Sequence, residues 1–272
     1  MANGRKSSGT CFPPVAISDT LPIMTRGCVV TGTDTGVGKT VVAAALVLCL
    51  RQRGLNVGVM KPVETGVGER GSALSDAEDL RAAGGTVDPV DAISPYRFAA
   101  PLAPLAAARQ AGIAIEMDRI LAAYERLAAG HALMVVEGVG GVMVPIGHQF
   151  NVRDLIARLG LPAVVVGRAT LGGVNHALLT VEALRQRRIA ILGIVLNHAA
   201  IPSEHSRTRP EASDTRQGNS TADLLKELSG VPVLGPLCHE PMLAQAREAG
   251  FGKVATEEAI RTLADLIMKD AP

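Results

Sequence analysis

The sequence predicts an α/β fold: a single doubly wound, mostly parallel sheet with helices on both faces. Short aliphatic runs alternate with longer amphipathic stretches from Gly27 onward, which is the pattern of strand–helix repetition. These runs are apolar throughout, as expected of parallel strands that are buried on both faces. Hydrophobic residues make up 47% of the chain and aromatic residues 2%, so the core is expected to be aliphatic.

Six short aliphatic runs are predicted to be strands. They are Cys28–Gly32, Asn56–Val63, Ala132–Gly138, Ala163–Arg168, Ile191–Asn197 and Val231–Gly235. Eight other stretches have the spacing of amphipathic helices. They cover residues 39–53, 74–83, 103–111, 116–129, 152–159, 174–188, 219–229 and 254–269.

The domain organisation follows from composition. Residues 27–272 are predicted to form one domain, because no strong break in composition appears between the helical and strand patterns. Residues 1–26 mix Ser, Gly, Pro and Thr without periodicity and are predicted to be a disordered extension. Residues 201–220 are polar and rich in Pro and Ser, and are predicted to be an exposed, mobile insertion.

Charge, cysteine spacing and hydropathy narrow the function class. A net charge of +1 gives no attraction for nucleic acid or for a membrane surface, so the expected partners are small molecules or proteins. The four cysteines lack metal-binding spacing and are typical of a reducing compartment. The longest apolar run, Val41–Leu50, is about half as long as a membrane span, and residues 1–26 contain no signal-peptide run. A cytoplasmic protein is predicted.

The stretch TGTDTGVGKT, Thr31–Thr40, has the features of a phosphate-binding loop with one extra residue. A Walker A loop reads G-x-x-x-x-G-K-[ST], and here its first glycine, Gly32, comes one residue early. A predicted strand precedes the loop and a predicted helix follows it. Backbone N–H groups would bind a polyphosphate, Lys39 would add charge and the Thr40 hydroxyl could reach Mg²⁺. A glycine-rich turn with an incidental lysine is the alternative.

The extra residue lies upstream of the core of the loop, Gly36–Thr40. We expect it to enlarge the front of the loop and to aim Asp34 or Thr35 across the γ-phosphate, toward the group that accepts it. A dinucleotide-binding loop is disfavoured, because GTDTGVG lacks the pattern G-x-G-x-x-G.

Four motifs in a fixed order resemble those of the dethiobiotin synthetases. They are GTDTGVGKT, MKPVETG from Met60, VVEGVGG from Val135 and LGGVNHALLT from Leu171, and Ser94–Gly112 resembles a further family segment. The resemblance covers roughly residues 27–197. It implies a P-loop NTPase-like fold, and the long front of the loop is the family's own form. It also implies an enzyme of biotin biosynthesis, a ligase that forms C–N bonds by cyclisation.

The reaction that the resemblance implies closes a cyclic urea. One amine of 7,8-diaminopelargonate captures CO₂ as a carbamate, ATP phosphorylates the carbamate, and the second amine displaces phosphate. Lys39 and Lys61 would be the catalytic residues, with Lys39 at the β- and γ-phosphates and Lys61 at the carbamate and the transferring phosphoryl group. Thr35 and Thr65 would bind the substrate. The implied nucleotide- and metal-contacting residues are Gly36, Val37, Gly38, Lys39, Thr40, Val41, Asp76, Glu137, Gly138, Val139, Gly140 and Asn197.

Mg²⁺ is expected as a cofactor, with oxygen ligands from Thr40, Asp76 and Glu137. Glu137 ends a hydrophobic predicted strand, where a Walker B carboxylate would lie. Asp76 matches a ligand of the family, although from sequence alone it could equally serve as a helix N-cap. Glu78 and Asp79 are nearby alternatives.

A homodimer is also implied. Gly173, Val174 and Asn175 begin a predicted helix, whose N–H groups could bind an anion. In the family this element reaches the substrate carboxylate across a dimer interface. A simple strand–helix turn is the alternative for this segment.

The sequence departs from the family pattern near the base-binding residues, so the preferred triphosphate stays open. The family usually has G-x-I-P after the last strand, but here Cys238 stands in the place of that proline, and His198 follows Asn197.

Two other classes fit less well. A switch ATPase has a signature lysine five residues before the loop lysine, where this chain has Asp34. An amide synthase of the cobyrinate type needs a glutaminase domain with a nucleophilic cysteine, and after Cys49 only Cys238 remains, close to the C-terminus.

Overall fold

The computed structural model describes residues 26–68, 75–198 and 212–269. Of the predicted disordered extension at residues 1–26, only Arg26 is described, as the first residue of a strand. Residues 201–211 of the predicted insertion also lie outside the described residues. No described helix is long and apolar enough to cross a membrane.

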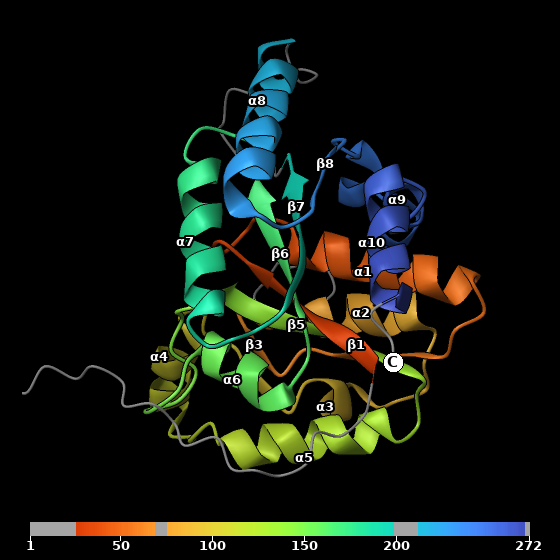
Figure 1. Ribbon diagram of the computed structural model, residues 1–272. Helices are drawn as coiled ribbons and strands as arrows, with labels where there is room; N and C mark the ends of the chain where they lie inside the picture. Colours follow the sequence, from red (N-terminus) through yellow and green to blue (C-terminus); the bar gives the residue numbers. More distant parts are fainter. Residues whose placement is uncertain (1–25, 69–74, 199–211, 270–272) are drawn as a thin grey trace, which may run out of the picture.

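A six-stranded, wholly parallel sheet forms the centre of the fold, with the strand order β2-β5-β1-β6-β7-β8 (Figure 1). Its strands are β1 (Arg26–Gly32), β2 (Val57–Met60), β5 (Leu133–Gly141), β6 (Ala163–Arg168), β7 (Ile191–Asn197) and β8 (Val233–Leu237). The first strand is central, since Val29 pairs with Val136 of β5 on one side and with Ala163 of β6 on the other. All six predicted strands are present, and the predicted fold class is confirmed.

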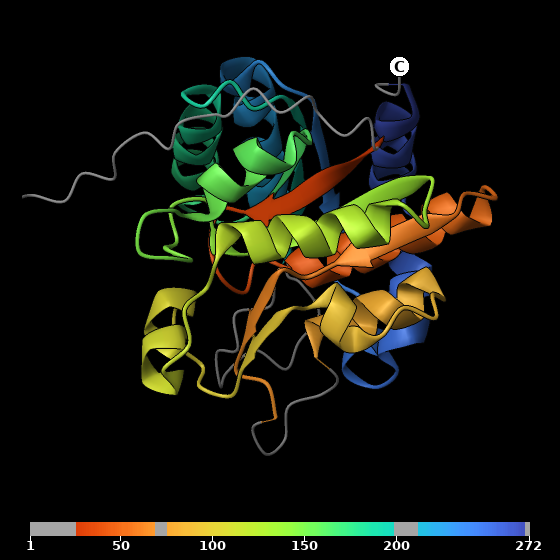
Figure 2. The ribbon, with the colours of Figure 1, turned by 90° about the horizontal axis from the view of Figure 1, so that it is seen from below.

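Helices cover both faces of this sheet (Figures 1 and 2). One face carries α1 (Lys39–Gln52), α2 (Asp76–Gly84), α3 (Val90–Ile93), α9 (Arg247–Val254) and α10 (Glu258–Lys269). The other carries α4 (Pro104–Ala111), α5 (Met117–Ala128), α6 (Val152–Leu159), α7 (Gly173–Arg185) and α8 (Ala212–Ser229).

Successive residues of each strand enter opposite cores. In β1, Val29 packs with the core under α5 to α7, whereas Cys28 and Val30 pack with the core under α1 and α10. This alternation follows from the period of two in a strand. Because both faces are buried, both sets of side chains are apolar, which explains the continuous aliphatic runs of the sequence.

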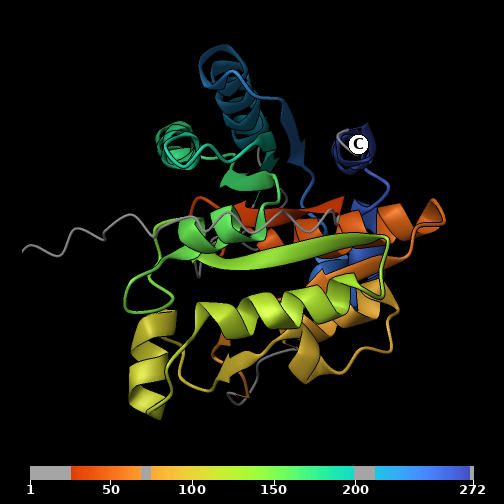
Figure 3. The same cartoon turned by 60° about the horizontal axis from the view of Figure 1, so that its bottom comes forward.

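Several short elements depart from the sequence-based prediction. A second, two-stranded parallel sheet pairs β3 (Val63–Thr65) with β4 (Tyr96–Phe98), and neither strand was predicted. The predicted strand Asn56–Val63 ends at Met60, and the Lys61 N–H donates instead to the Ile93 carbonyl, 2.9 Å away. Three-residue strands are too short to show a periodic signal. Figure 3 shows this small sheet at the side of α5, beyond the edge of the central sheet.

The helices at the C-terminal end differ in extent. The predicted helix 219–229 begins at Ala212, so the C-terminal part of the polar stretch 201–220 is helical. The predicted helix 254–269 corresponds to α10, which begins at Glu258. The preceding helix α9, which overlaps the predicted range only at Val254, and the 3₁₀ turn η1 (Pro241–Ala244) were not predicted. Two glycines in α9 hid its helical character in the sequence, because glycine is a poor helix former.

Candidate active site

The phosphate-loop residues connect β1 to α1 at the carboxyl edge of the sheet. Gly38 is the N-cap of α1 and has φ 94°, a left-handed conformation that favours glycine. A Cβ on Gly38 would lie 2.0 Å from Nδ2 of Asn197, at the end of β7. The same Nδ2 donates to the Val37 carbonyl at 3.0 Å. The loop is therefore anchored to β7, and only glycine fits at position 38.

The front of the loop is attached to the end of β6. The Asp34 carboxylate accepts from the Thr35 N–H at 2.7 Å and pairs with Arg168 Nη2 at 3.2 Å. Arg168 also donates to the Thr35 carbonyl at 3.2 Å. Of the two residues expected to face the acceptor, Thr35 lines the adjoining cavity, whereas the Asp34 side chain is bound to Arg168. The Lys39 ammonium donates to the Asp34 carbonyl at 2.9 Å.

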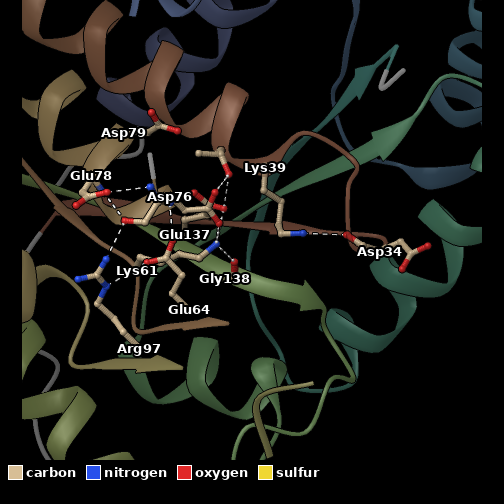
Figure 4. A network of polar contacts seen from close by, with 12 residues as sticks. Asp34, Lys39, Lys61, Glu64, Asp76, Glu78, Asp79, Arg97, Glu137 and Gly138 are labelled. Carbon is tan, nitrogen blue, oxygen red and sulfur yellow. Dashed lines mark hydrogen bonds and ion pairs between the residues drawn. The ribbon is translucent and has the colours of Figure 1, made fainter. Parts of the chain in front are cut away.

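Four polar side chains from four elements converge beside the loop (Figure 4). The Lys61 ammonium lies 2.6 Å from Glu137 Oε1 and 2.7 Å from Asp76 Oδ2. The Thr40 hydroxyl lies 2.9 Å from Glu137 Oε1 and 3.0 Å from Asp76 Oδ1. Lys61 is 3% exposed and Glu137 1%, so this contact is screened little by water.

Local structure explains why these side chains meet. Lys61 directly follows β2 and Glu137 lies within β5, its neighbour in the sheet. Asp76 is placed by the N-terminus of α2, where Ser75 and Glu78 form a capping box: the Glu78 N–H donates to the Ser75 hydroxyl and the Ser75 N–H to the Glu78 carboxylate. With Ser75 as the cap, the Asp76 side chain is free to face Thr40 and Lys61.

A further carboxylate supports the cluster from β3. Glu64 Oε1 accepts from the Asp76 N–H at 2.5 Å, and Glu64 Oε2 lies 3.6 Å from Arg97 Nε on β4. Glu64 is 5% exposed, and burial raises its pKa. The small sheet of β3 and β4 thus helps to position the first turn of α2.

The electrostatics of the site are set by burial and by the paired charges. Burial, followed by repulsion from Lys61, lowers the pKa of Lys39 to about 8. Burial raises the pKa of Glu137 to about 7. Burial acts to lower the pKa of Lys61, but attraction to Glu137 and Asp76 outweighs it and holds this pKa above its ordinary value. The pKa of Asp76 is lowered in spite of burial, because Lys61 and the Thr40 hydroxyl stabilise its charge.

These side chains open into a cavity of about 620 Å³. The predicted site residues that line it are Thr35, Gly36, Gly38, Lys39, Thr40, Val41, Lys61, Thr65, Asp76, Glu137, Val139 and Gly140. Residues 101–104, before and at the start of α4, close the side near Thr65. A second cavity of about 890 Å³ shares Gly36, Gly38 and Val41 with the first and includes Asn197 and Cys238.

The remaining predicted residues lie around or away from these cavities. Val37 is buried beneath the loop, and the Gly138 carbonyl accepts from Lys61 at 3.2 Å. Gly173, Val174 and Asn175 begin α7 and line neither cavity. The structure thus brings the loop, Lys61, Thr65, Asp76 and Glu137 together within one chain, but not the start of α7.

Sequence reasoning missed four charged residues at or near the site: Glu64, Arg97, Arg168 and Arg247. Glu64 lies in the motif MKPVETG, which could have singled it out. Arg97 lies in the segment Ser94–Gly112, which also resembles the family. Arg168 and Arg247 lie outside these motifs, and only the fold brings them to the site.

The oxygen atoms of Thr40, Asp76 and Glu137 fit a magnesium ion. They come from three elements, and one oxygen atom of each carboxylate lies within 3.0 Å of the Thr40 hydroxyl. Glu137 Oε2 is buried with no hydrogen-bond partner among the described residues, so it is available as a ligand. No cluster of three or more Asp, Glu, His or Cys suited to a metal occurs in the described part of the chain. Two carboxylates and one hydroxyl suit Mg²⁺, which usually keeps water and phosphate among its ligands.

Comparison with known proteins identifies the family. A family model described as an AAA domain matches residues 26–247. The ATP-dependent dethiobiotin synthetase BioD of Anaeromyxobacter dehalogenans (strain 2CP-C) is 56% identical over 174 residues, which cover 63% of this chain and 76% of that protein. The protein of the same name from Thermodesulfovibrio yellowstonii is 38% identical over 241 residues, covering 85% of this chain and 95% of that protein. This chain belongs to the dethiobiotin synthetase family.

Dethiobiotin synthetases are ligases, so the resemblance drawn from the four motifs and the enzyme class expected from it are both confirmed. Among solved structures, the MinC:MinD cell division complex of Aquifex aeolicus has a TM-score of 0.54 at 15% identity, over 91% of this chain and 98% of that one. At this identity the likeness shows the fold alone.

Proposed function

We propose that this chain is an ATP-dependent dethiobiotin synthetase. It would convert 7,8-diaminopelargonate and CO₂ to a carbamate, phosphorylate the carbamate with ATP, and close the ureido ring with release of ADP and phosphate. The observation that carries the proposal, beside the family, is the buried Lys61 ammonium, which lies at the floor of the cavity beyond the phosphate loop. A phosphate loop alone would be compatible with many ATPases. A second buried lysine would favour the transfer of a phosphoryl group between two anions, ATP and the carbamate.

The loop residues would bind the triphosphate. The N–H groups of Gly36–Thr40 and the N-terminus of α1 form an anion site, because unpaired N–H groups and the helix dipole attract negative charge. Lys39 would add its charge to the β- and γ-phosphates. Its present partner is a neutral backbone carbonyl, that of Asp34, so a phosphate oxygen would be a stronger acceptor.

Lys61 would serve the phosphoryl acceptor. Its ammonium would neutralise the carbamate and the charge that develops during transfer, since it is fixed at the cavity floor before substrate binds. Thr40, Asp76 and Glu137 would hold Mg²⁺, which supplies charge neutralisation at the phosphates when it is bound. The buried Glu137 carboxylate and Asp76 also hold Lys61 in its charged form.

The substrate would occupy the part of the cavity between Thr35, Thr65 and residues 101–104. Both hydroxyls could bind the carbamate or an amine. Gly173, Val174 and Asn175 would reach the substrate carboxylate from a second copy of the chain, because they do not line the cavity of their own chain. A homodimer, a cytoplasmic location and one catalytic domain over residues 27–272 belong to this proposal.

Nucleotide turnover with and without the diamine tests the proposed function. We expect ADP release from MgATP to be slow alone and strongly stimulated by diaminopelargonate with bicarbonate, with dethiobiotin as the product in mass spectrometry. Equal turnover in the absence of the diamine would refute the synthetase proposal and favour a switch ATPase. The triphosphates should be compared in the same assay, because Cys238 and His239 line the second cavity beside Asn197.

A further inference from the structure

An ion pair between a buried aspartate of α2 and a partly exposed arginine of α9 lies beside the site and has no role in the mechanism above. Asp79 of α2 is 3% exposed, and its Oδ2 accepts from Arg247 Nε at 2.8 Å and also from Arg247 Nη2. In Figure 4, Asp79 lies in α2 beside Asp76 and Glu78 but outside the contacts of the Lys61 cluster. The Asp79 carboxylate is therefore not among the oxygen atoms that surround the Thr40 hydroxyl.

Arg247 lines the same cavity as Lys39, Thr40 and Lys61. Its guanidinium carbon lies 5.4 Å from the centroid of the Phe251 ring, on the next turn of α9. Two contacts thus fix the guanidinium, one with the Asp79 carboxylate and one with the Phe251 ring. A side chain held on two sides loses little conformational entropy when it binds a ligand.

Part of this guanidinium is available for a ligand. An arginine carries five N–H donors, and the contacts with Asp79 use Nε and Nη2. Nη1 has no hydrogen-bond acceptor within the described ranges of the chain.

We propose that Arg247 is a further phosphate-binding residue of this enzyme, held in position by Asp79. Its free N–H donors would bind the polyphosphate of the nucleotide from the side of α9. This inference rests on the proposed function, because it needs a nucleotide in the loop. Asp79 would act only through Arg247 and is a positioning residue.

The competing explanation is a structural bridge. Arg247 joins α9 to α2, and an ion pair between two helices can stabilise a fold without touching a ligand. The two explanations differ in one measurable respect. A bridge affects unfolding, whereas a phosphate contact affects the affinity for nucleotide in the folded protein.

The test compares Arg247→Gln, Arg247→Lys and Asp79→Asn with the unmodified chain by calorimetric titration of MgATP, steady-state kinetics and thermal unfolding. Arg53→Gln is the matched control, since Arg53 also pairs with an aspartate, Asp265, but lines neither cavity. We expect Arg247→Gln to weaken MgATP binding about tenfold, as for a lost charge-assisted hydrogen bond. The KM for ATP should rise by a similar factor and the KM for the diamine should not change.

Two further variants sharpen the result. Arg247→Lys keeps a cation and should recover part of the MgATP affinity, and it is the variant to use if Arg247→Gln does not fold. Asp79→Asn should weaken MgATP binding less than Arg247→Gln does. In the double variant, Asp79→Asn should add little to the loss of affinity caused by Arg247→Gln, because Asp79 acts through Arg247.

The outcomes separate cleanly. If Arg247→Gln lowers the unfolding temperature but keeps its MgATP affinity within about twofold of that of the unmodified chain, the ion pair is a structural bridge and the inference is wrong. If the unmodified chain itself does not bind MgATP, the proposed function fails first. Unchanged affinity in Arg53→Gln is required for either interpretation.

Discussion

The Lys61 ammonium and the Glu137 carboxylate form a contact of 2.6 Å at the carboxyl edge of the sheet, and both side chains are almost completely buried. A buried ion pair gains little net stability, because desolvation of both charges offsets their attraction. Both residues of this pair line the cavity beside the phosphate loop. Its position therefore points to chemistry rather than to stability.

Lys61→Gln separates this role from nucleotide binding. Because Lys61 would interact most with charge that develops during transfer, the variant should keep its MgATP affinity within about threefold and lose about a hundredfold or more in kcat. Calorimetric titration beside a product assay measures both. Lys226→Gln is the control, since Lys226 pairs with Asp223 on the surface of α8. Near-normal turnover of Lys61→Gln would leave Lys39 as the only catalytic lysine.

Lys39→Gln should behave differently. Lys39 lies in the loop that would bind the phosphates, so its loss should reduce both MgATP affinity and turnover, each by about tenfold or more. Titration of MgATP and the same product assay give the two numbers. A variant that bound MgATP normally and lost only kcat would show that Lys39 acts only in the transition state.

The metal ligands are tested by Asp76→Ala and Glu137→Ala. Each should lower Mg²⁺-dependent turnover by about a hundredfold or more, because several kcal/mol of charge stabilisation is lost with a ligand. Turnover as a function of Mg²⁺ concentration is the measurement. Glu78→Gln keeps the capping interaction with Ser75 and should behave like the unmodified chain. A nearly silent Asp76→Ala would contradict the assignment of Asp76 as a ligand.

Gly38→Ala tests the anchoring of the loop to β7. The new methyl group would collide with Asn197 Nδ2, at 2.0 Å, in addition to the strain at φ 94°. We expect a lower unfolding temperature and a loss of MgATP affinity of at least about tenfold, because the loop must shift. Gly112→Ala is the control: it has φ 66° and no atom within 4 Å, so it should show only the strain of about 1–2 kcal/mol. Equal effects on MgATP binding would refute the anchor.

Cys28 gives a prediction for stability against pH. Burial raises the pKa of its thiol from 9.0 to about 12. As the pH rises above 9.0, the unfolded chain loses this proton before the folded chain does. The free energy of unfolding should therefore fall between pH 9.0 and about 12, by about 1 kcal/mol per pH unit. Denaturant unfolding at several alkaline pH values should show a shallower fall for Cys28→Ala. Parallel curves for the two proteins would contradict the prediction.

The sequence by itself determined the central architecture. The bounds of β6 and β7 in the structure, Ala163–Arg168 and Ile191–Asn197, are the predicted ones, as are those of α6. These elements carry strong local patterns, and periodicity is a property of neighbouring residues. The loop Gly36–Thr40 was recognisable for the same reason, since its chemistry lies within one contiguous stretch.

The tertiary structure decided how distant residues meet. Asp34 is bound to Arg168, 134 positions away, and Asp79 to Arg247, 168 positions away. No local pattern encodes such contacts, because they depend on the order of strands in the sheet and on the packing of α9 against α2. The strands β3 and β4 are likewise stabilised by pairing with each other rather than by their own three residues. Local sequence patterns determined the helices and strands, whereas long-range packing determined which charged side chains surround the cavity.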